Sequence, residues 1–166
     1  VLRSALAHVD GAAWVYAFAA STPDLLVQVL DVVRPQRIIA WHKPWNTSPP
    51  QHGISWHMEM ILVRAGSEKP CGTISDVLSV EAIWRKDHPE NQPHPTQKPV
   101  ALMRLILEAA VAGAVYDPFA GSGTTIVAAE QVGRACAAVE IDPRYVAVTL
   151  ERLAGLGLTP RLAENG

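Results

Sequence analysis

The sequence has little of several features that would place it in a specialised class. It holds two cysteines in 166 residues, Cys71 and Cys136, and their separation does not match a zinc-ligand spacing. This favours ordinary thiols in a reducing compartment over a disulfide, so we expect a cytoplasmic protein. No apolar run approaches the length of a membrane span.

Charge is also sparse. Charged residues make up 18% of the chain and the formal net charge is −2, so the protein as a whole does not attract nucleic acid. A DNA-binding face would have to be a local basic patch. The length of 166 residues and the 49% hydrophobic content suit one domain with a buried core. The first residue is valine, so we expect an upstream segment.

Hydrophobic patterns of strand and helix type alternate along the chain, which predicts an α/β fold. Strands are predicted at residues 13–19, 37–41, 55–64, 112–116 and 135–139, and helices at 2–8, 23–33, 99–111, 124–132 and 143–154.

The most informative stretch is Asp117-Pro-Phe-Ala-Gly-Ser-Gly-Thr-Thr125, a glycine turn between a predicted strand and a predicted helix. Glu140 follows Gly123 by seventeen positions, at the end of the next predicted strand. In open α/β sheets this order builds a nucleotide-binding pocket, with the acid placed to accept hydrogen bonds from ribose hydroxyls. The alternative is a glycine turn that merely joins strand to helix.

Two residues narrow the choice of nucleotide. A dinucleotide fingerprint needs a third glycine where this chain has Ile126, and a triphosphate loop needs a lysine where it has Thr124. S-adenosylmethionine has a ribose, an adenine and a carboxylate but no phosphate, so it suits a short glycine turn with a distal acid.

The chain resembles the amino-group DNA methyltransferases, which act on adenine N6 or cytosine N4. Four segments carry the resemblance: Ile38-Ile-Ala-Trp-His-Lys43, His94-Pro-Thr-Gln-Lys-Pro99, the glycine turn, and Glu140-Ile-Asp-Pro-Arg-Tyr145. Their order is similar to that of the permuted beta class, in which the catalytic half precedes the cofactor half.

The resemblance implies a Rossmann-like S-adenosylmethionine-dependent methyltransferase fold, with a mostly parallel sheet and helices on both faces. It implies a single domain: catalytic-half elements in 1–65, a short target-recognition-like insert in 66–92, the cofactor half in 93–154 and a tail in 155–166. The implied reaction is direct methyl transfer to an exocyclic amine of double-stranded DNA, of the restriction–modification kind. The resemblance also implies a prokaryotic or phage-encoded protein.

The resemblance also implies a set of cofactor-binding residues. They are Thr96, Lys98, Asp117, Pro118, Phe119, Gly121, Gly123, Thr124, Glu140 and Ile141. Alternatives stay open for four of these positions. Thr96 also suits a cap for the helix that follows it. Asp117 also suits a helix-capping acid, Ile141 also suits plain core, and the segment around Lys98 also suits a solvated turn before a helix. Asp142 is expected to cap a helix.

Contacts with DNA are predicted for Lys43, Arg85 and Lys86. A core tryptophan plus a surface lysine is an equal account of Trp41-His42-Lys43, and a surface charge pair is the simpler account of Arg85 and Lys86. A metal site at His57 and Glu59 is not expected, because no third ligand is evident.

The resemblance also implies a base-holding motif that residues 1–166 do not contain. The family holds the target base with Asp, Asn or Ser followed by Pro-Pro and an aromatic residue. The near match, residues 48–51, has Gln51 in place of the aromatic and lies two strands too late. We expect the motif before Val1, so the catalytic residues are unknown and this segment alone should be inactive.

The strand that carries the motif would then be missing from between strands 112–116 and 13–19. These two strands should either pair with each other or receive a strand from a second chain or an upstream segment. Two alternatives to a DNA methyltransferase stay open: a methyltransferase for RNA or protein, and a non-catalytic domain that binds DNA or a partner.

Overall fold

The structure is a computed structural model that describes residues 2–19, 23–44, 57–83 and 97–161. The chain divides into two compact units. The first unit comprises Val1–Ala82 with Ala109–Ala112, and the second comprises Ile83–Glu108 with Gly113–Gly166. The division between residues 82 and 83 falls inside the predicted insert 66–92, while the predicted single domain stays a prediction.

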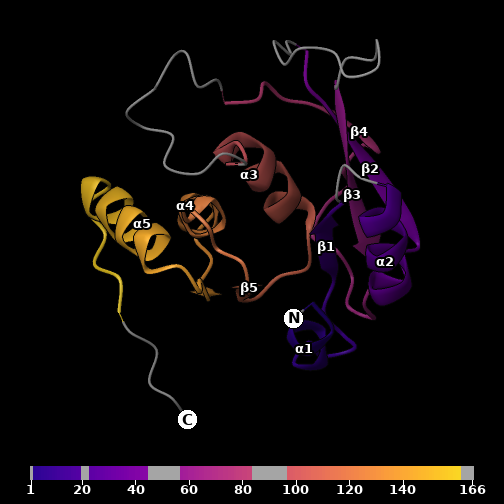
Figure 1. Ribbon diagram of the computed structural model, residues 1–166, viewed down its shortest axis with the longest axis horizontal. Helices are drawn as coiled ribbons and strands as arrows, with labels where there is room; N and C mark the ends of the chain where they lie inside the picture. The colour runs from indigo at the N-terminus through magenta and orange to yellow at the C-terminus, as the bar shows by residue number, and fades with distance from the viewer. Residues whose placement is uncertain (1, 20–22, 45–56, 84–96, 162–166) are drawn as a thin grey trace. The chain divides into compact units, whose positions relative to one another are not determined.

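The first unit contains a four-stranded sheet (Figure 1). Its elements are α1 (Leu2–Ala7), β1 (Val15–Phe18), α2 (Pro23–Val33), β2 (Arg37–His42), β3 (Met58–Arg64) and β4 (Val77–Ser79). The strand order is β1-β3-β2-β4, with β3 antiparallel to both neighbours and β2 parallel to β4.

The core of this unit lies along β3. Ile61, Leu62 and Val63 are all buried, although consecutive strand residues point to opposite faces. A strand that is covered on both faces needs such an unbroken apolar run. Helix α2 packs against β3. Trp41 on β2 is 2% exposed, and its Nε1–H donates to the carbonyl of Val80 at 2.8 Å.

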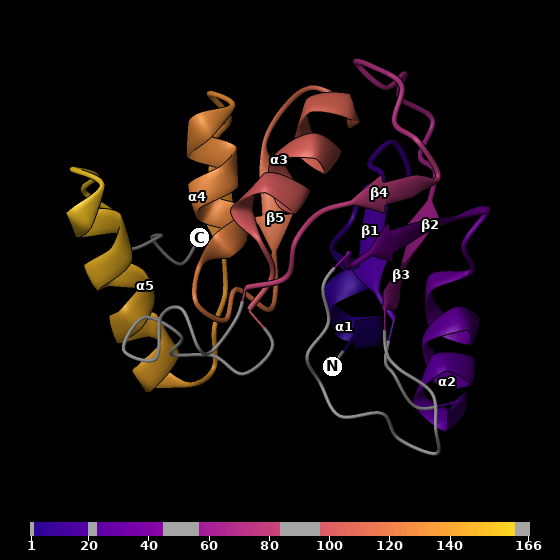
Figure 2. The same cartoon turned by 90° about the horizontal axis from the view of Figure 1, so that it is seen from above.

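The second unit is built around a strand–helix–strand crossover. Its elements are α3 (Val100–Ala109, whose last residue clusters with the first unit), β5 (Val115–Asp117), α4 (Thr124–Gln131), β6 (Cys136–Ala138) and α5 (Pro143–Gly155). Strands β5 and β6 are parallel, with Tyr116 opposite Ala137, and α4 packs on β6. Figure 2 shows α4 and α5 as neighbouring helices.

Every predicted helix and strand is present, and the Rossmann-like α/β class is confirmed. Strands β1, β5 and β6 are shorter than predicted, whereas β2 extends one residue further than predicted, to His42. Strand β4, inside the predicted insert, was missed. Its three residues are too few to form an alternating pattern, and it is a strand because it pairs in parallel with β2.

The four-stranded sheet is mixed rather than mostly parallel, since two of its three ladders are antiparallel. The sequence contains the reason. No helix is predicted between residues 43 and 53, and a strand that follows without a crossover helix returns antiparallel to the one before it.

Strands β1 and β5 belong to separate sheets, so the predicted pairing between them is not observed in the part of the chain that the structure describes. Each is the last strand of its own sheet within those residues. A strand supplied from elsewhere stays a prediction. No helix among the described residues has both the length and the apolar character needed to cross a bilayer.

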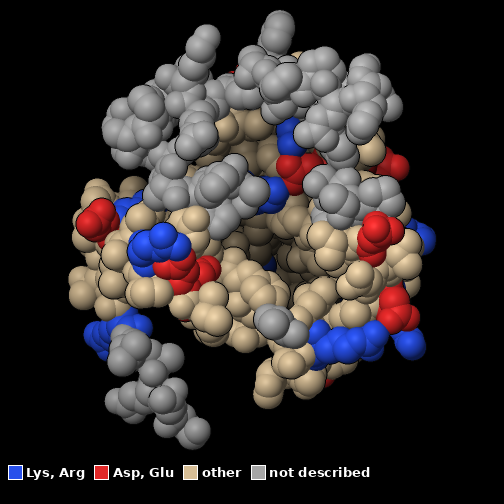
Figure 3. Space-filling view, viewed as in Figure 1, with Lys and Arg blue, Asp and Glu red and all other residues tan. Residues whose placement is uncertain are grey.

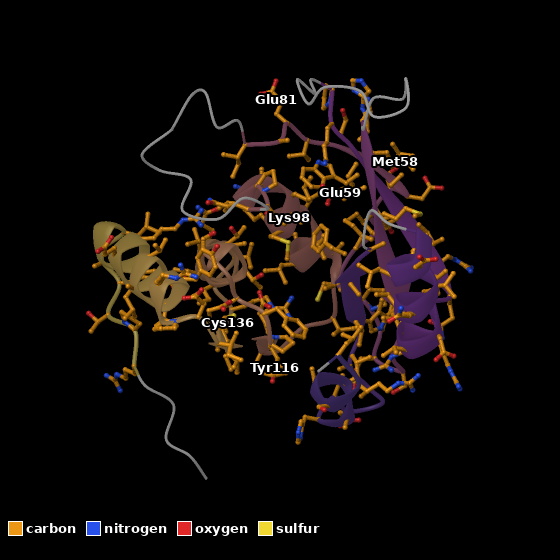
Figure 4. The ribbon with its side chains drawn as sticks, viewed as in Figure 1. Met58, Glu59, Glu81, Lys98, Tyr116 and Cys136 are labelled. Carbon is orange, nitrogen blue, oxygen red and sulfur yellow. The ribbon has the colours of Figure 1, made fainter. Side chains whose placement is uncertain are left out.

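The two thiols have different surroundings. Cys71 is exposed, whereas Cys136 lies on β6 beside the strand that carries Tyr116 (Figure 4). Burial, and then the carboxylate of Asp117, raise the pKa of the Cys136 thiol from 9.0 to about 11. A shift of this size lowers the thiolate fraction near neutral pH about a hundredfold.

Iodoacetamide at pH 8 should therefore alkylate Cys71 well before Cys136. Peptide mapping by mass spectrometry after a timed quench measures the two rates. The same reaction in denaturant is the control, because both thiols are exposed there and should react at similar rates. Equal rates in the folded protein would contradict the assigned environment of Cys136.

Candidate functional site

The glycine turn starts at the carboxyl end of β5. The Oδ1 atom of Asp117 accepts a hydrogen bond of 2.9 Å from the Phe119 N–H. This is an Asx turn, in which the carboxylate fixes the chain direction two residues further on. Asp117 therefore does not cap α4, and the helix-capping alternative for this residue is wrong.

Helix α4 begins at an N-cap that offers no side chain. Gly123 is the N-cap, with φ of +76°, in the left-handed region that glycine tolerates best. A Cβ atom at Gly123 would lie 2.6 Å from Cγ2 of Thr149, so the neighbouring helix also requires glycine here. Because no side chain among the described residues caps α4, none of them competes with an anionic ligand for its first-turn N–H groups.

Glu140 stands beside the glycine turn. Its Oε2 accepts a hydrogen bond of 2.7 Å from the Gly121 N–H, and its Oε1 accepts one of 2.9 Å from the Asp142 N–H. The two bonds fix the plane of the carboxylate. A carboxylate has about four lone-pair sites, so about two remain for a ligand. The structure thus joins Glu140 and Gly121, which the sequence analysis placed in one pocket.

The backbone carries the β5–β6 pairing on into the turn. The Val139 N–H donates to the carbonyl of Asp117 at 2.9 Å, and the Ala120 N–H donates to the carbonyl of Val139 at 3.0 Å. These bonds hold the turn and the end of β6 in register, so the position of Glu140 is set by the sheet rather than by its own side chain alone.

Ile141 and Asp142 follow Glu140. Ile141 is 96% exposed, so the core alternative for this residue is wrong, and its side chain is open to a ligand. Asp142 is the N-cap of α5 and accepts a hydrogen bond of 2.9 Å from the Arg144 N–H, as predicted. Hydrogen bonds from the Arg144 guanidinium and backbone lower the pKa of Asp142 to about 2.

The Thr124 side chain is hydrogen-bonded to the backbone of Lys98. The Thr124 hydroxyl donates to the carbonyl of Lys98 at 3.1 Å, which brings the segment before α3 to the start of α4. The adjacent Gln97 has a buried Oε1 atom with no hydrogen-bond partner among the described residues. Thr96 and His94 lie outside those residues.

Two residues of α5, Thr149 and Arg152, donate hydrogen bonds to the glycine turn or to the first residue of α4. Neither was predicted from the sequence. Thr149 donates to the carbonyl of Gly121, and Arg152 donates to the carbonyl of Ser122 and to the Thr124 hydroxyl. Their spacing of three places them on one face of α5. The spacing is visible in the sequence, but it does not indicate that this face of α5 meets the turn.

The predicted DNA contacts lie in other parts of the chain. Lys43 forms an ion pair with Glu59, the β3 residue labelled in Figure 4. The Lys43 Nζ also lies 4.8 Å from the centroid of the Trp41 ring. The Lys43 side chain is 14% exposed, and Trp41 is a core residue. Arg85 and Lys86 lie outside the described residues, as do residues 48–51.

Acidic and basic side chains are interspersed on the face shown in Figure 3, and no basic stripe crosses its described residues. No cluster of three or more metal-ligating side chains occurs among the residues described. Glu59 is paired with Lys43, and Nδ1 of His57 lies 3.3 Å from the carbonyl of Lys43.

Comparison with families and curated proteins gives consistent matches. A family model described as DNA methylase matches residues 10–151. The putative methylase YubD of Escherichia coli (strain K12) is 31% identical over 120 residues, which cover 71% of this chain and 50% of YubD. The DNA adenine methyltransferase YhdJ of the same organism is 47% identical over 88 residues, which cover 52% of this chain and 29% of YhdJ. The matched part of this chain thus spans half of these relatives' length or less.

Solved structures share the fold at low sequence identity. A complex of M1.HpyAVI with SAM has a TM-score of 0.74 at 20% identity and covers 92% of this chain and 79% of that one. The PvuII DNA methyltransferase, described as cytosine-N4-specific, has a TM-score of 0.64 at 19% identity, with 84% and 62% covered.

Proposed function

Because the chain belongs to the DNA methylase family, we propose that it binds S-adenosylmethionine as the cofactor-binding part of a DNA methyltransferase. The proposed enzyme transfers the methyl group to the exocyclic amine of adenine (N6) or cytosine (N4) in double-stranded DNA. Relatives named as methyltransferases support this reaction class. Action on chromosomal or phage DNA would place the protein in the cytoplasm.

The described residues fit the chemical groups of this cofactor. The remaining lone pairs of Glu140 suit the two ribose hydroxyls, and the uncapped start of α4 suits the carboxylate. The buried Oε1 of Gln97 is an acceptor that suits the cofactor ammonium. The exposed side chains of Ile141 and Phe119 suit an apolar ring face. When bound, the cofactor supplies an electrophilic methyl group on a sulfonium.

One observation carries the proposal. The Glu140 carboxylate is held by the Gly121 amide, so the acid and the glycine turn form one rigid unit at the carboxyl end of two parallel strands. Ligands bind at this edge in open α/β sheets. A glycine turn that only joined strand to helix would not need a carboxylate fixed against it.

The remaining predicted contacts are part of the proposal. Thr96, Lys98, Asp117 and Pro118 would complete the cofactor pocket. Lys43, Arg85 and Lys86 would contact DNA phosphates. For Lys43 such a contact has a cost, because its ammonium would share or leave its ion pair with Glu59. A strand and a base-holding motif from another segment or chain would complete the enzyme.

The chain of residues 1–166 should bind S-adenosylmethionine without methylating DNA. Isothermal titration should show saturation at one cofactor per chain, because the ribose and carboxylate sites lie on one unit. ATP and NAD are control ligands and should give no saturable heat, since Thr124 and Ile126 replace the residues that phosphate loops require.

Transfer of a labelled methyl group to DNA is the second measurement, and we expect none above background. Robust DNA methylation by residues 1–166 would contradict the proposal that the base-holding motif lies elsewhere. Absence of saturable cofactor binding would contradict the proposed cofactor itself.

A non-catalytic role is the second candidate, and one observation favours it. Residues 1–166 contain no Asp, Asn or Ser followed by Pro-Pro and an aromatic residue. A domain that only binds DNA or a partner should do so equally with and without the cofactor. Binding measurements on DNA, RNA and protein substrates, each with and without S-adenosylmethionine, separate this role from a methyltransferase.

A further inference from the structure

Helix α5 holds the glycine turn by its carbonyl groups. The Thr149 hydroxyl donates to the carbonyl of Gly121 at 3.1 Å. Nη1 of Arg152 donates to the carbonyl of Ser122 at 3.1 Å and to Oγ1 of Thr124 at 3.2 Å. Thr149 is 7% exposed, so its hydroxyl is committed to the turn rather than to water.

Fixing these carbonyls also fixes the amides of the same peptide groups. No described peptide bond is cis, and in a trans peptide the N–H points opposite to the C=O. With the carbonyls of Gly121 and Ser122 directed at α5, the N–H groups of Ser122 and Gly123 point away from α5. The Gly123 N–H closes the turn on the carbonyl of Ala120 at 2.8 Å. The orientation of the turn is therefore set by α5 on one side and by Glu140 on the other.

The placement of Arg152 carries an electrostatic cost. Its guanidinium lies at the first residue of α4, where the helix dipole is positive. Burial lowers the pKa of Arg152 because it disfavours the charged form. No ion pair to a carboxylate is found for Arg152 among the described residues. A bound carboxylate at this helix terminus would relieve both costs.

We propose that Thr149 and Arg152 are positioning residues, which hold residues 121–124 in the conformation that receives the amino-acid end of the cofactor. This inference rests on the proposed function and adds two residues of α5 that lie outside the sequence motifs. Neither residue needs to touch the cofactor. Thr149 acts through the peptide group between Gly121 and Ser122, and Arg152 acts through the Ser122 carbonyl and the Thr124 hydroxyl.

The test compares two ligands that differ at one end. S-adenosylhomocysteine carries the amino-acid group, and 5′-methylthioadenosine is the same nucleoside without it. Thr149→Val removes the hydroxyl but keeps the branched shape, and Arg152→Met removes the charge and donors but keeps the stem. Each should weaken S-adenosylhomocysteine about tenfold, which is the effect of about one lost hydrogen bond.

The same variants should bind 5′-methylthioadenosine within about twofold of the unsubstituted chain, because Glu140 would still accept hydrogen bonds from the ribose hydroxyls. Equal losses for both ligands would assign Thr149 and Arg152 to general stability and overturn the proposal, and so would unchanged affinity for S-adenosylhomocysteine. Thr149→Ser is the matched control. It keeps the hydroxyl and should bind both ligands normally, and a loss there would assign Thr149 to packing against Gly123 alone.

If Arg152→Met unfolds the protein, Arg152→Lys is the variant that still tests the role of Arg152. Its ammonium reaches one of the two acceptors, so the loss should be smaller than that of Arg152→Met and again confined to S-adenosylhomocysteine. Failure of the unsubstituted chain to bind either ligand would overturn the proposed function and this inference together. Binding by the unsubstituted chain with unchanged affinity in the variants would overturn this inference only.

Discussion

Replacing Glu140 with glutamine should weaken the binding of S-adenosylmethionine about a hundredfold, as expected for one or two lost charge-assisted hydrogen bonds. The carboxylate accepts hydrogen bonds from the Gly121 and Asp142 amides, one on each oxygen. Glutamine has one oxygen, so its NH₂ group must face one of these N–H donors. The substitution thus removes the charge offered to the ribose and also disturbs the hold on the glycine turn.

Glu130→Gln is the matched control, because Glu130 is an exposed carboxylate on α4 and its loss should leave affinity unchanged. Thermal melting in the absence of ligand separates binding from folding. Glu140→Gln should bind weakly while it remains folded at the assay temperature. Affinity equal to that of the unsubstituted chain would contradict the assigned role of Glu140.

Replacing Gly66 with alanine should destabilise the first unit by about 3 kcal/mol or more, at the upper end for overpacking. A Cβ atom at Gly66 would lie 2.0 Å from the carbonyl oxygen of Ala12 and 2.5 Å from that of Ala13. Both are backbone atoms and cannot rotate away. The Ser67 and Glu68 amides donate to carbonyls of the same segment, so relief of the clash would break this pairing as well.

Gly11→Ala is the control for this substitution, since a Cβ atom at Gly11 would meet nothing within 4 Å. Urea denaturation followed by circular dichroism measures both variants. The midpoint of Gly66→Ala should fall far below that of Gly11→Ala. Similar midpoints would show that the segment at Ala12 moves freely, against the close contact described here.

The sequence predicted the part of the site that depends on local order along the chain. The strand, glycine turn and helix from residue 115 to 131 follow from an apolar run, two glycines and a helical pattern. The contact between Glu140 and the turn follows from their spacing, since a strand–helix–strand crossover brings the ends of consecutive parallel strands to one edge.

Features that depend on tertiary contacts were not accessible from the sequence. Strand β4 exists through its pairing with β2, and Gly66 is required by a backbone segment more than fifty residues earlier in the chain. In the sequence, Thr149 and Arg152 look like ordinary polar positions of an amphipathic helix. The sequence does not indicate what each face of that helix packs against. Ile141 was ambiguous for a similar reason, since core and ligand contact both favour an apolar side chain.

The role of Lys43 could not be predicted from its neighbours in the sequence alone. A lysine after a strand that enters a proline-rich loop suits a phosphate contact, and it equally suits an ion pair. The structure supplies Glu59 from the neighbouring antiparallel strand and the Trp41 ring beneath the ammonium. Glu59 follows Lys43 by sixteen positions, so only the register of β2 against β3 brings the two together, whereas Trp41 lies two residues before Lys43 in the sequence.

The most direct test of the central claim is a crystal structure of the chain with S-adenosylhomocysteine. We predict that both ribose hydroxyls lie within about 3 Å of the Glu140 carboxylate, as hydrogen bonds require. The ligand carboxylate should lie at the start of α4, beside residues 121–124. A ligand bound elsewhere, or a ribose that faces away from Glu140, would contradict the account.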